Sequence, residues 1–551
     1  MKKRKEIFFL ISILFFAFLI RAIWLDKNPI ELSGDELDVG YQAFSLLKTG
    51  KDYLGNKLPI YLHSFSESRT PLLSYLLIPF VGILGLNAWA VRLPVAIFGV
   101  IDILFLYLLI LLITKNNRLS LICAFVYSVV PWHLHYSRLA FDTTLLLGLI
   151  TLGTYFFYKE KWFFSSVCFA FSLYAYNTAN VFLPLFIFGL ILFNRQKFSK
   201  VGKQHFAAAG TFLFLVFPLC LTIFFGQGAT RFKSINILNN PAMIASLIFK
   251  RTTGISSRVE RIFYNKPLAV SKEFFKNYVK SFSLDFLFLN GDPNPRHNLP
   301  GRGEFYLTML PFLLLGVWAL LINKEKSLKS LIFLWLFLAP IPSALTVEGG
   351  NHATRLSLMI PPLVFLISYG AHAFLKSKKT IVVFFSILII SLSFWLYEYF
   401  VHYGKEEYKH WEYGYREIFT WLKQREKDYP RVILNNSHDP ILLRYLFWTA
   451  KDPRFLQKNY KGDKSEKNIL PYFDGFKLEN VYLGNINIDD KDWWLGDYLD
   501  KETVYLAFQK DEIPGGWDWE KDPPDRIKVL KTIRDPLSKE PYIYLLTAGN
   551  K

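Results

Sequence analysis

The chain has 551 residues, of which 52% are hydrophobic, 18% aromatic and only 20% charged, with a formal net charge of +19. Soluble proteins of this length normally carry about 25% charged residues, and many apolar residues here lie in long runs without charge. This composition excludes a disordered chain, a fibrous repeat and an ordinary cytosolic enzyme, and it indicates a polytopic membrane protein. The positive charge does not indicate a nucleic-acid partner, because the Lys and Arg residues cluster in short loops between apolar runs.

Eleven apolar segments predict membrane-spanning helices, and the first of them is 7–25. It follows the basic sequence Met-Lys-Lys-Arg-Lys, and no small-residue cleavage site comes after it, so we expect an uncleaved span with a cytoplasmic N-terminus. With alternating crossings, the basic loops fall on the cytoplasmic side and the C-terminus lies outside. The further predicted spans are 92–113, 119–132, 142–158, 162–176, 179–193, 207–225, 306–323, 330–345, 355–375 and 380–399.

The segment 71–86 is also apolar enough to be a span. If it crossed the membrane, every basic loop after it would change sides, against the positive-inside rule. We therefore expect a helix that lies at the outer surface, or re-enters without crossing, within one long external loop over 26–91. A crossing helix is the alternative. A second long external loop is expected over 226–305.

The composition changes after residue 400, where the chain becomes polar and rich in Lys, Asp and Trp. Short β-like runs such as Val504-Tyr-Leu-Ala-Phe occur there, and helical patterns fall near 412–427 and 438–450. We expect a transmembrane module over 1–400 and a soluble extracytoplasmic α/β domain over 401–551. The predicted fold class is mainly α, a polytopic membrane helix bundle of about eleven spans with this C-terminal domain.

An acidic pair opens the first external loop. Ser33 can cap a helix that begins near Asp35, Glu36 completes the spacing of a capping box, and Gly50 ends the helix. The two acids are either first-turn residues favoured by the helix dipole or functional carboxylates. The second interpretation rests on their place about ten residues after a span, near anionic headgroups, where acids gain little unless they take part in chemistry.

Basic residues at the outer ends of spans are candidates for binding a phosphate. Arg69 precedes Pro71 at the start of the predicted surface helix, and it is either an interfacial arginine or a guanidinium that binds a lipid phosphate bidentately. Arg138 and Asp142 are four residues apart at a membrane boundary. They form either an ordinary i,i+4 ion pair or an acid and a base that line a substrate path.

Two later external loops repeat this chemistry. One holds Arg296 and His297 in a sequence rich in turn residues, and the other holds His352 and Arg355 just before a span. Both loops are expected outside, so their basic groups would gather on the same side of the membrane as Asp35. The alternative for each loop is an Arg or His that anchors at the membrane interface.

The sequence offers no convincing metal or nucleotide motif. His133 and His135 have a spacing that could suit a metal, but no convincing third ligand is present, so we interpret them as interfacial histidines. A Walker loop, a GxGxxG after a strand, HExxH and GxSxG are all missing from the sequence. The energy for a transfer reaction would then come from a sugar already attached to a membrane phosphate.

The order of these motifs resembles the GT-C superfamily of integral-membrane glycosyltransferases, in the branch of protein O-mannosyltransferases and lipid A aminoarabinose transferases, with a likeness to glycosyltransferase family 39. The resemblance covers about residues 5–225 well and the later spans loosely. It is carried by Asp35-Glu36, Tyr41, Gly50, Thr70-Pro-Leu-Leu-Ser-Tyr75, Gly85-Leu-Asn-Ala-Trp-Ala-Val-Arg92-Leu-Pro94 and Arg138 with Asp142.

The resemblance implies a GT-C fold, two surface helices in the first external loop and a polyprenyl-phosphate sugar as donor. It implies that Asp35 is the catalytic base with Glu36 beside it, and that Asp142 is a second acid near the site. Arg69 stands in Arg-Thr-Pro where the family often has Lys-Pro-Pro. Together with the loop residues above, the candidates for binding the donor phosphate are Arg69, Arg92, Arg138, Arg296, His297, His352 and Arg355.

The predicted function is a membrane glycosyltransferase, a hexosyl or pentosyl transferase that moves a sugar to an acceptor hydroxyl on the outer face of the cell membrane. A carboxylate takes the hydroxyl proton, arginines stabilise the leaving phosphate, and one displacement inverts the anomeric centre. No cofactor is expected to be required, and a divalent metal is possible but unsupported by the sequence. Expected partners are the lipid-linked donor, a glycan, lipid or protein acceptor, and membrane lipids, without nucleic acid. The alternatives are a transporter or flippase of lipid-linked sugars and a non-enzymatic scaffold.

Overall fold

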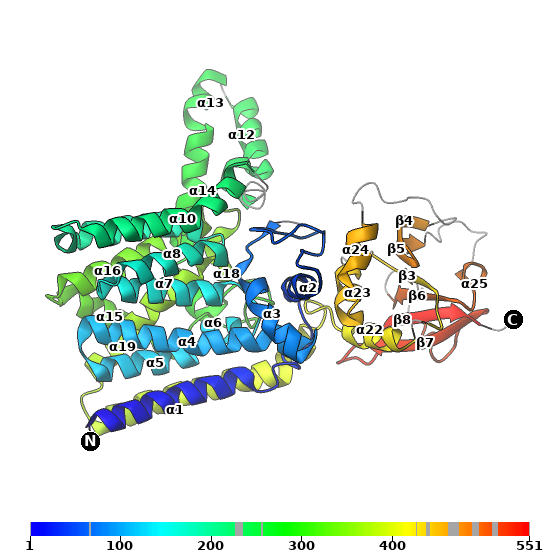
Figure 1. Ribbon diagram of the computed structural model, residues 1–551, viewed down its shortest axis with the longest axis horizontal. Coiled ribbons are helices and arrows are strands. Elements are labelled where there is room, and N and C mark those ends of the chain that lie inside the picture. Colours follow the sequence, from blue (N-terminus) through cyan, green and yellow to red (C-terminus); the bar gives the residue numbers. More distant parts are fainter. Residues whose placement is uncertain are drawn as a thin grey trace. The chain divides into compact units, whose positions relative to one another are not determined.

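The computed structural model describes residues 2–65, 68–225, 235–254, 257–425, 427–436, 441–460, 473–486, 495–509 and 516–549. These residues form two compact units, shown in Figure 1. We name them the bundle unit, which comprises Met1–Leu25, Ile60–Leu73 and Arg92–Tyr399, and the tail unit, which comprises Asp26–Pro59, Ser74–Val91 and Phe400–Lys551. The tail unit thus joins the residues after 400 to most of the first predicted loop. The functional domain boundary at residue 400 stays a prediction.

A bundle of apolar helices makes up most of the bundle unit, as the composition predicts. Every one of the eleven predicted spans coincides with a helix, and Figure 1 shows α1, α4, α8 and α10 running along one shared direction. The expected helix bundle is therefore confirmed. The eleven helices are α1 (Lys2–Ala22), α4 (Ala88–Thr114), α5 (Asn117–Val129), α7 (Thr143–Tyr158), α8 (Trp162–Ala175), α9 (Ala179–Phe193), α10 (Lys203–Phe225), α15 (Leu310–Ile322), α16 (Lys326–Leu338), α19 (Ile360–Phe374) and α20 (Lys378–Tyr397).

Five helical segments in the described part of the chain are each long and apolar enough to cross a membrane. They are 88–114, 203–223, 326–344, 353–374 and 378–406. Further apolar helices of 10–17 residues accompany them, including α5, α7, α8 and α9. These findings show a multi-pass membrane protein, while eleven crossings with a cytoplasmic N-terminus remain a prediction.

Helices α15 and α19 approach each other closely because each has glycine at the contact. A Cβ atom on Gly316 would lie 1.8 Å from the carbonyl oxygen of Leu366, and one on Gly370 would lie 2.0 Å from that of Phe312. No side chain fits at either position. Small residues that let backbones meet are typical of helix packing in membranes, where dispersion replaces the hydrophobic effect as the main source of stability.

The segment 226–305, expected as an external loop, contains helices in its described part. They are α12 (Pro241–Thr253), α13 (Ser257–Phe263) and α14 (Lys266–Lys280), and the first and third begin with proline in the first turn after an asparagine cap. In Figure 1, α12 and α13 project away from the other helices of the bundle unit, beyond α10 and α14. A turn-rich stretch over 290–305 then leads back to the bundle.

The tail unit contains a mixed sheet of six strands in the order β4-β5-β3-β6-β8-β7. β3 (Arg431–Leu434) is parallel to β5 (Val481–Ile486) and to β6 (Thr503–Phe508). β4 (Phe473–Leu478), β7 (Ile527–Arg534) and β8 (Pro541–Ala548) pair antiparallel with their neighbours. The predicted helices are present as α22 (Tyr415–Gln424) and α23 (Ile441–Thr449), so the expected α/β domain is confirmed.

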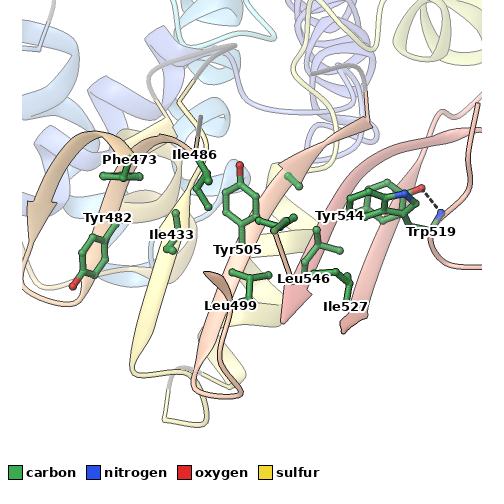
Figure 2. Packing of buried hydrophobic residues seen from close by; sticks show 12 residues of the cluster. Ile433, Phe473, Tyr482, Ile486, Leu499, Tyr505, Trp519, Ile527, Tyr544 and Leu546 are labelled. Carbon is green, nitrogen blue, oxygen red and sulfur yellow. Dashed lines mark hydrogen bonds between the residues drawn. The ribbon is translucent and has the colours of Figure 1, made fainter. Parts of the chain in front are cut away.

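Apolar side chains on one face of this sheet form a core, shown in Figure 2. Ile433, Tyr505 and Leu546 lie on neighbouring strands, and Trp519 packs against Tyr544 at the edge, where the Tyr544 hydroxyl accepts a hydrogen bond from the Trp519 backbone N–H. Trp519 is therefore a core residue. The rings of Trp493 and Trp494 suit either packing in a core or stacking on a sugar, and both residues lie outside the described residues.

Both helices expected in the first external loop are present, as α2 (Gly34–Thr49) and α3 (Leu72–Leu84). α2 ends at Gly50, whose φ of 65° is the left-handed conformation that glycine favours. Within the tail unit, α2 packs against α23 at Gly40, where a Cβ would lie 2.7 Å from the ring of Phe447 and from Val91. The surface position of α3 stays a prediction.

Glu31 gives the tail unit a testable dependence on pH. Its carboxylate is buried and accepts hydrogen bonds from the backbone N–H groups of Arg416 at 3.1 Å and Leu32 at 3.4 Å. Burial raises the pKa of Glu31 from 4.5 to about 7, against the smaller lowering effect of these bonds and of Arg444. The folded chain thus binds this proton more tightly than the unfolded chain does.

We expect the contribution of Glu31 to the free energy of unfolding to fall by about 3 kcal/mol between about pH 4.5 and pH 7, because the unfolded chain loses the proton first. Glu31→Gln should flatten the pH profile in this range. The measurement is unfolding of the full chain in detergent at several pH values. An unchanged slope in the variant would contradict the assignment.

Candidate active site

The first turn of α2 holds the predicted acidic pair. The Oγ atom of Ser33 accepts a hydrogen bond from the backbone N–H of Glu36 at 3.4 Å, and the backbone N–H of Ser33 donates to Glu36 Oε2 at 3.0 Å. The predicted capping box is confirmed. Because Glu36 is fully buried in this cap and Asp35 is half-buried, Asp35 is the better placed of the two for chemistry.

Asp38 is a third acid on α2 that sequence reasoning missed, although its spacing of three residues places it on the same helix face as Asp35. It is buried and accepts a hydrogen bond of 2.6 Å from the hydroxyl of Tyr53. The ring of Tyr41 lies 5.9 Å from that of Tyr53, and the Tyr41 hydroxyl donates to the carbonyl of Lys451 at 2.9 Å. Burial raises the pKa of Tyr41, so its hydroxyl stays neutral. The ring of Tyr41 packs against Tyr53 and its hydroxyl binds a carbonyl, so we assign this residue a structural role.

Arg138 is fully buried in the bundle unit and binds the C-terminal turn of α1. Its Nη1 donates to the carbonyls of Ile20 at 2.9 Å and Arg21 at 2.8 Å, and its Nη2 donates to that of Ile23 at 2.9 Å. Its guanidinium also lies 5.1 Å from the ring centre of Tyr399. Arg138 therefore satisfies carbonyls that the end of a helix leaves unpaired. Its phosphate-binding role stays a prediction.

Arg92 and Arg69 are also held inside the bundle unit. Arg92 is fully buried near the start of α4, and its Nη1 donates to the carbonyl of Leu25 at 3.0 Å. Arg69 ends the strand β2 (Ser68–Arg69), which pairs with β1 (Leu62–His63), and only 8% of it is exposed. The next residue, Thr70, donates to the carbonyl of Ala175 at 2.9 Å and so fixes this segment to α8.

Asp292 joins two of the predicted basic loops. Its Oδ2 lies 2.9 Å from Nδ1 of His297 and 3.8 Å from Nδ1 of His352, and it accepts a hydrogen bond from the backbone N–H of Ala353 at 2.8 Å. The rings of the two histidines are 4.9 Å apart. The two loops therefore lie together, and Asp292, which links them, belongs to the turn-rich sequence that holds Arg296 and His297. The expectation that these basic groups share a side of the membrane with Asp35 stays a prediction.

Electrostatics at this cluster favour an ionised Asp292. Burial alone would raise the pKa of the Asp292 carboxyl, but its hydrogen bond to His297 and the charges of His297 and His352 outweigh burial, so the pKa lies below its usual value. Burial raises the pKa of nearby Glu304 well above its usual value, and the Asp292 charge raises it further. Glu304 Oε1 accepts a hydrogen bond from the Asp292 backbone N–H at 3.2 Å.

His135 connects the Asp292 cluster to the buried arginines. Its Nε2 lies 2.9 Å from the carbonyl oxygen of Arg296, and its ring centre is 5.8 Å from that of Tyr399, which also contacts Arg138. Burial is the main reason that the pKa of His135 falls to about 3. The bond to Arg296 raises this pKa, and the charges of His297, Arg138 and Arg92 lower it. The bundle unit thus gathers five predicted phosphate-binding residues in one connected region, namely Arg92, Arg138, Arg296, His297 and His352.

Two further predicted residues lie at helix starts. Arg355 belongs to α18 (Ala353–Leu356), and its Nη1 donates to Thr346 Oγ1 at 2.8 Å and to the carbonyl of Val347 at 3.2 Å. Asp142 stands at the N-terminal cap position of α7 and is half-buried. The roles of both residues in catalysis stay predictions.

Asp292, His297 and His352 are also the described residues that could hold a metal ion, because one ligand atom from each lies within 4.8 Å of the others. A carboxylate and two imidazoles suit zinc and other divalent transition metals. Sequence reasoning treated His297 and His352 as anion-binding residues and did not place Asp292 with them. The expectation that no metal is required is not tested by this geometry.

A buried polar trio inside the bundle was also missed. Nη2 of Arg21 lies 3.0 Å from Nδ1 of His133, and Nε2 of His133 lies 3.5 Å from Oδ2 of Asp102. All three side chains are 1% exposed or less. The signal was present in the sequence, since Asp102 is an acid within the apolar run 92–113.

Comparisons with known proteins agree with this architecture. The sequence pattern of the dolichyl-phosphate-mannose-protein mannosyltransferase family, PMT_2, matches residues 68–222. A comparison with curated proteins finds no match. The structure of ArnT from Cupriavidus metallidurans bound to undecaprenyl phosphate is 11% identical with a TM-score of 0.51, over 98% of this chain and 97% of that one. ArnT in the apo state gives 10% identity and a TM-score of 0.50, over 99% and 98%.

An archaeal oligosaccharyltransferase, AglB from Archaeoglobus fulgidus in complex with an inhibitory peptide and a dolichol-phosphate, is 12% identical with a TM-score of 0.47. The comparison covers 81% of this chain, which spans about 64% of the length of AglB.

The likeness to ArnT along nearly the whole chain defines a GT-C fold, so the predicted fold class and the predicted resemblance are confirmed. Within that class, the sequence pattern over residues 68–222 is that of the protein mannosyltransferases. The chain is therefore similar to the GT-C glycosyltransferases both in fold and in this part of its sequence.

Proposed function

We propose that this protein is a membrane glycosyltransferase that moves a sugar from a polyprenyl-phosphate donor to an acceptor hydroxyl at the outer face of the membrane. The observation that carries the proposal is Asp35, a half-buried acid in the first turn of α2, beside a glutamate that is taken up by the helix cap. ArnT, which shares the fold, was solved with undecaprenyl phosphate bound. A lipid phosphate of this class is the donor that we propose here.

In this mechanism, Asp35 accepts the proton of the acceptor hydroxyl as that oxygen attacks the anomeric carbon. The bond between the sugar and the phosphate breaks in the same step, and the electron pair leaves with the lipid phosphate. Arg69, Arg92 and the other predicted basic groups stabilise the charge that develops on this phosphate. A single displacement inverts the anomeric centre and needs no covalent glycosyl-enzyme. We retain Asp142 as the second acid.

The test is incubation of the purified full-length protein with a panel of hexosyl and pentosyl polyprenyl phosphates and with candidate glycan, lipid and protein acceptors. We expect release of lipid phosphate with at least one donor, dependent on the acceptor. A flippase, which the family pattern and the fold do not favour, would move donor across a vesicle bilayer without releasing lipid phosphate. That outcome would overturn the proposal.

We also propose that transfer needs no metal, because arginines can neutralise the charge of a single leaving phosphate. Treatment with EDTA should leave the transfer rate unchanged within about twofold. The control is EDTA saturated with Mg²⁺ or Zn²⁺. If the chelator abolished transfer and an added metal restored it, this prediction would be wrong, and the trio of Asp292, His297 and His352 would be the place to seek the ion.

A further inference from the structure

A groove of about 1120 Å³ lies in the bundle unit between the end of α9, the turn η1 (Arg195–Phe198) and α16. It changes in character along its length. One end is lined by basic side chains, including Arg195 and Lys326, and the rest is lined by apolar ones, including Phe193 and Phe337. A charged end that continues into an apolar channel has the chemistry of a lipid.

The groove follows a single face of α16. Its lining residues on this helix recur every three or four positions, from Lys326 and Lys329 through Phe333 to Phe337. From Lys326 to Phe337 the helix rises about 16 Å, which is about half the thickness of a bilayer's hydrocarbon core. The apolar part therefore matches the depth of one leaflet.

The basic end of the groove offers free positive charge. Arg195 and Lys326 are exposed and make no ion pair with any described residue, whereas Lys197 is paired with Glu160 at 2.6 Å. The first turn of α16 adds the positive end of its helix dipole, and the four basic side chains that line the groove outnumber its one acidic side chain, that of Glu325. These features favour a phosphate.

The basic end of the groove is separate from the candidate active site. The basic end lies at the first turn of α16. The candidate site follows the opposite end of this helix, where the chain passes through α17 (Ile341–Ala344) to Thr346, which binds Arg355, and then to His352. The basic end also includes one of the loops that the positive-inside rule places in the cytoplasm.

Phe193 and Phe337 are more than half exposed, so lipid tails can reach the groove from the side.

We propose that this groove binds an anionic glycerophospholipid of the inner leaflet, with the phosphate between Arg195, Lys326 and the start of α16, and an acyl chain along Phe333 and Phe337. Basic pockets between membrane helices on the cytoplasmic side are typical sites for acidic lipid headgroups. The proposal is independent of the sugar-transfer reaction, because none of these residues is placed in that machinery.

The test uses the delipidated full-length protein in an uncharged detergent, titrated with phosphatidylglycerol or with phosphatidylcholine of the same acyl chains. Native mass spectrometry counts the bound lipid. We expect a clear preference for phosphatidylglycerol and an affinity about 30-fold lower in the double variant Arg195→Gln/Lys326→Gln, from the loss of two charges near the phosphate. The matched control is Lys378→Gln/Lys379→Gln, which removes two exposed charges from the start of α20 and should change the affinity by less than about twofold.

Several results would overturn the proposal. These are equal binding of both phospholipids, equal loss in the two double variants, displacement of phosphatidylglycerol by an equal concentration of free glycerol phosphate, and equally tight binding of a polyprenyl phosphate. Unfolding curves of both variants in detergent check that the fold is retained, and the wild-type lipid preference decides the question if either variant fails that check.

Discussion

Asp35→Asn is expected to lower the rate of sugar transfer by about 10²–10⁴-fold, because an amide cannot accept the proton of the acceptor hydroxyl. The substitution keeps the size of the side chain and leaves untouched the hydrogen bonds between Ser33 and Glu36 that cap α2. Expression and folding should therefore be retained. The measurement is the single-turnover release of lipid phosphate from the donor that the panel identifies.

Glu36→Gln is the matched variant, because glutamine at this position also forms a capping box. We expect it to lose much less activity than Asp35→Asn, since the carboxylate of Glu36 is already engaged by Ser33. If Asp35→Asn transferred sugar at the wild-type rate, Asp35 would have no part in the mechanism. A larger loss for Glu36→Gln than for Asp35→Asn would assign the base to Glu36 instead.

Replacing Arg138 by methionine should lower the free energy of unfolding by about 3–5 kcal/mol. The guanidinium donates to the carbonyls of Ile20, Arg21 and Ile23, and methionine would leave all three acceptors, two of which are buried, without this donor. The measurement is denaturant or thermal unfolding of the detergent-solubilised protein, followed by a signal from the bundle unit.

Arg138→Lys is the control for that experiment. Lysine keeps the charge but cannot reproduce the fork with which one guanidinium reaches three carbonyls, so we expect an intermediate loss of stability. A stable Arg138→Met protein that had lost only its affinity for the donor would contradict the structural role and would support the predicted phosphate contact.

The helices of the bundle could be predicted because each is an apolar run between basic loops, and this signal is local. The hairpin of β4 and β5 was missed because Asp474, Lys477 and Asn485 interrupt its apolar pattern. Its turn also lacks the usual Asn-Gly signal, since Glu479 adopts the positive φ of 53° that such a turn needs. Strand pairing in the tail unit is likewise a long-range property that no single segment encodes.

In the candidate site, too, local contacts could be predicted from the sequence and long-range contacts could not. The capping box of Ser33 and Glu36 was predictable, because both partners lie within one helical turn. The partners of Arg138 were not, because the carbonyls it binds are about 115 positions away in the sequence. Asp292 lies in the turn-rich sequence before Arg296, and its contact with His352 depends on how two distant loops pack.

The sequence was therefore enough to select Asp35, Glu36 and the buried arginines as candidates. The structure was needed to identify the groups that they contact. Asp102 could have been predicted to have a buried partner, because an acid within an apolar run is costly unless it is paired. Its proximity to His133 and Arg21 meets that need inside the bundle.

The most direct test of the proposed reaction is a product analysis after a single turnover of the full-length protein with a polyprenyl-phosphate sugar of known anomeric configuration. We expect one lipid phosphate to be released for each glycosidic bond formed, and NMR to show a product of inverted configuration. A product of retained configuration, or disappearance of the donor from one leaflet without any glycosidic bond, would contradict the proposed reaction.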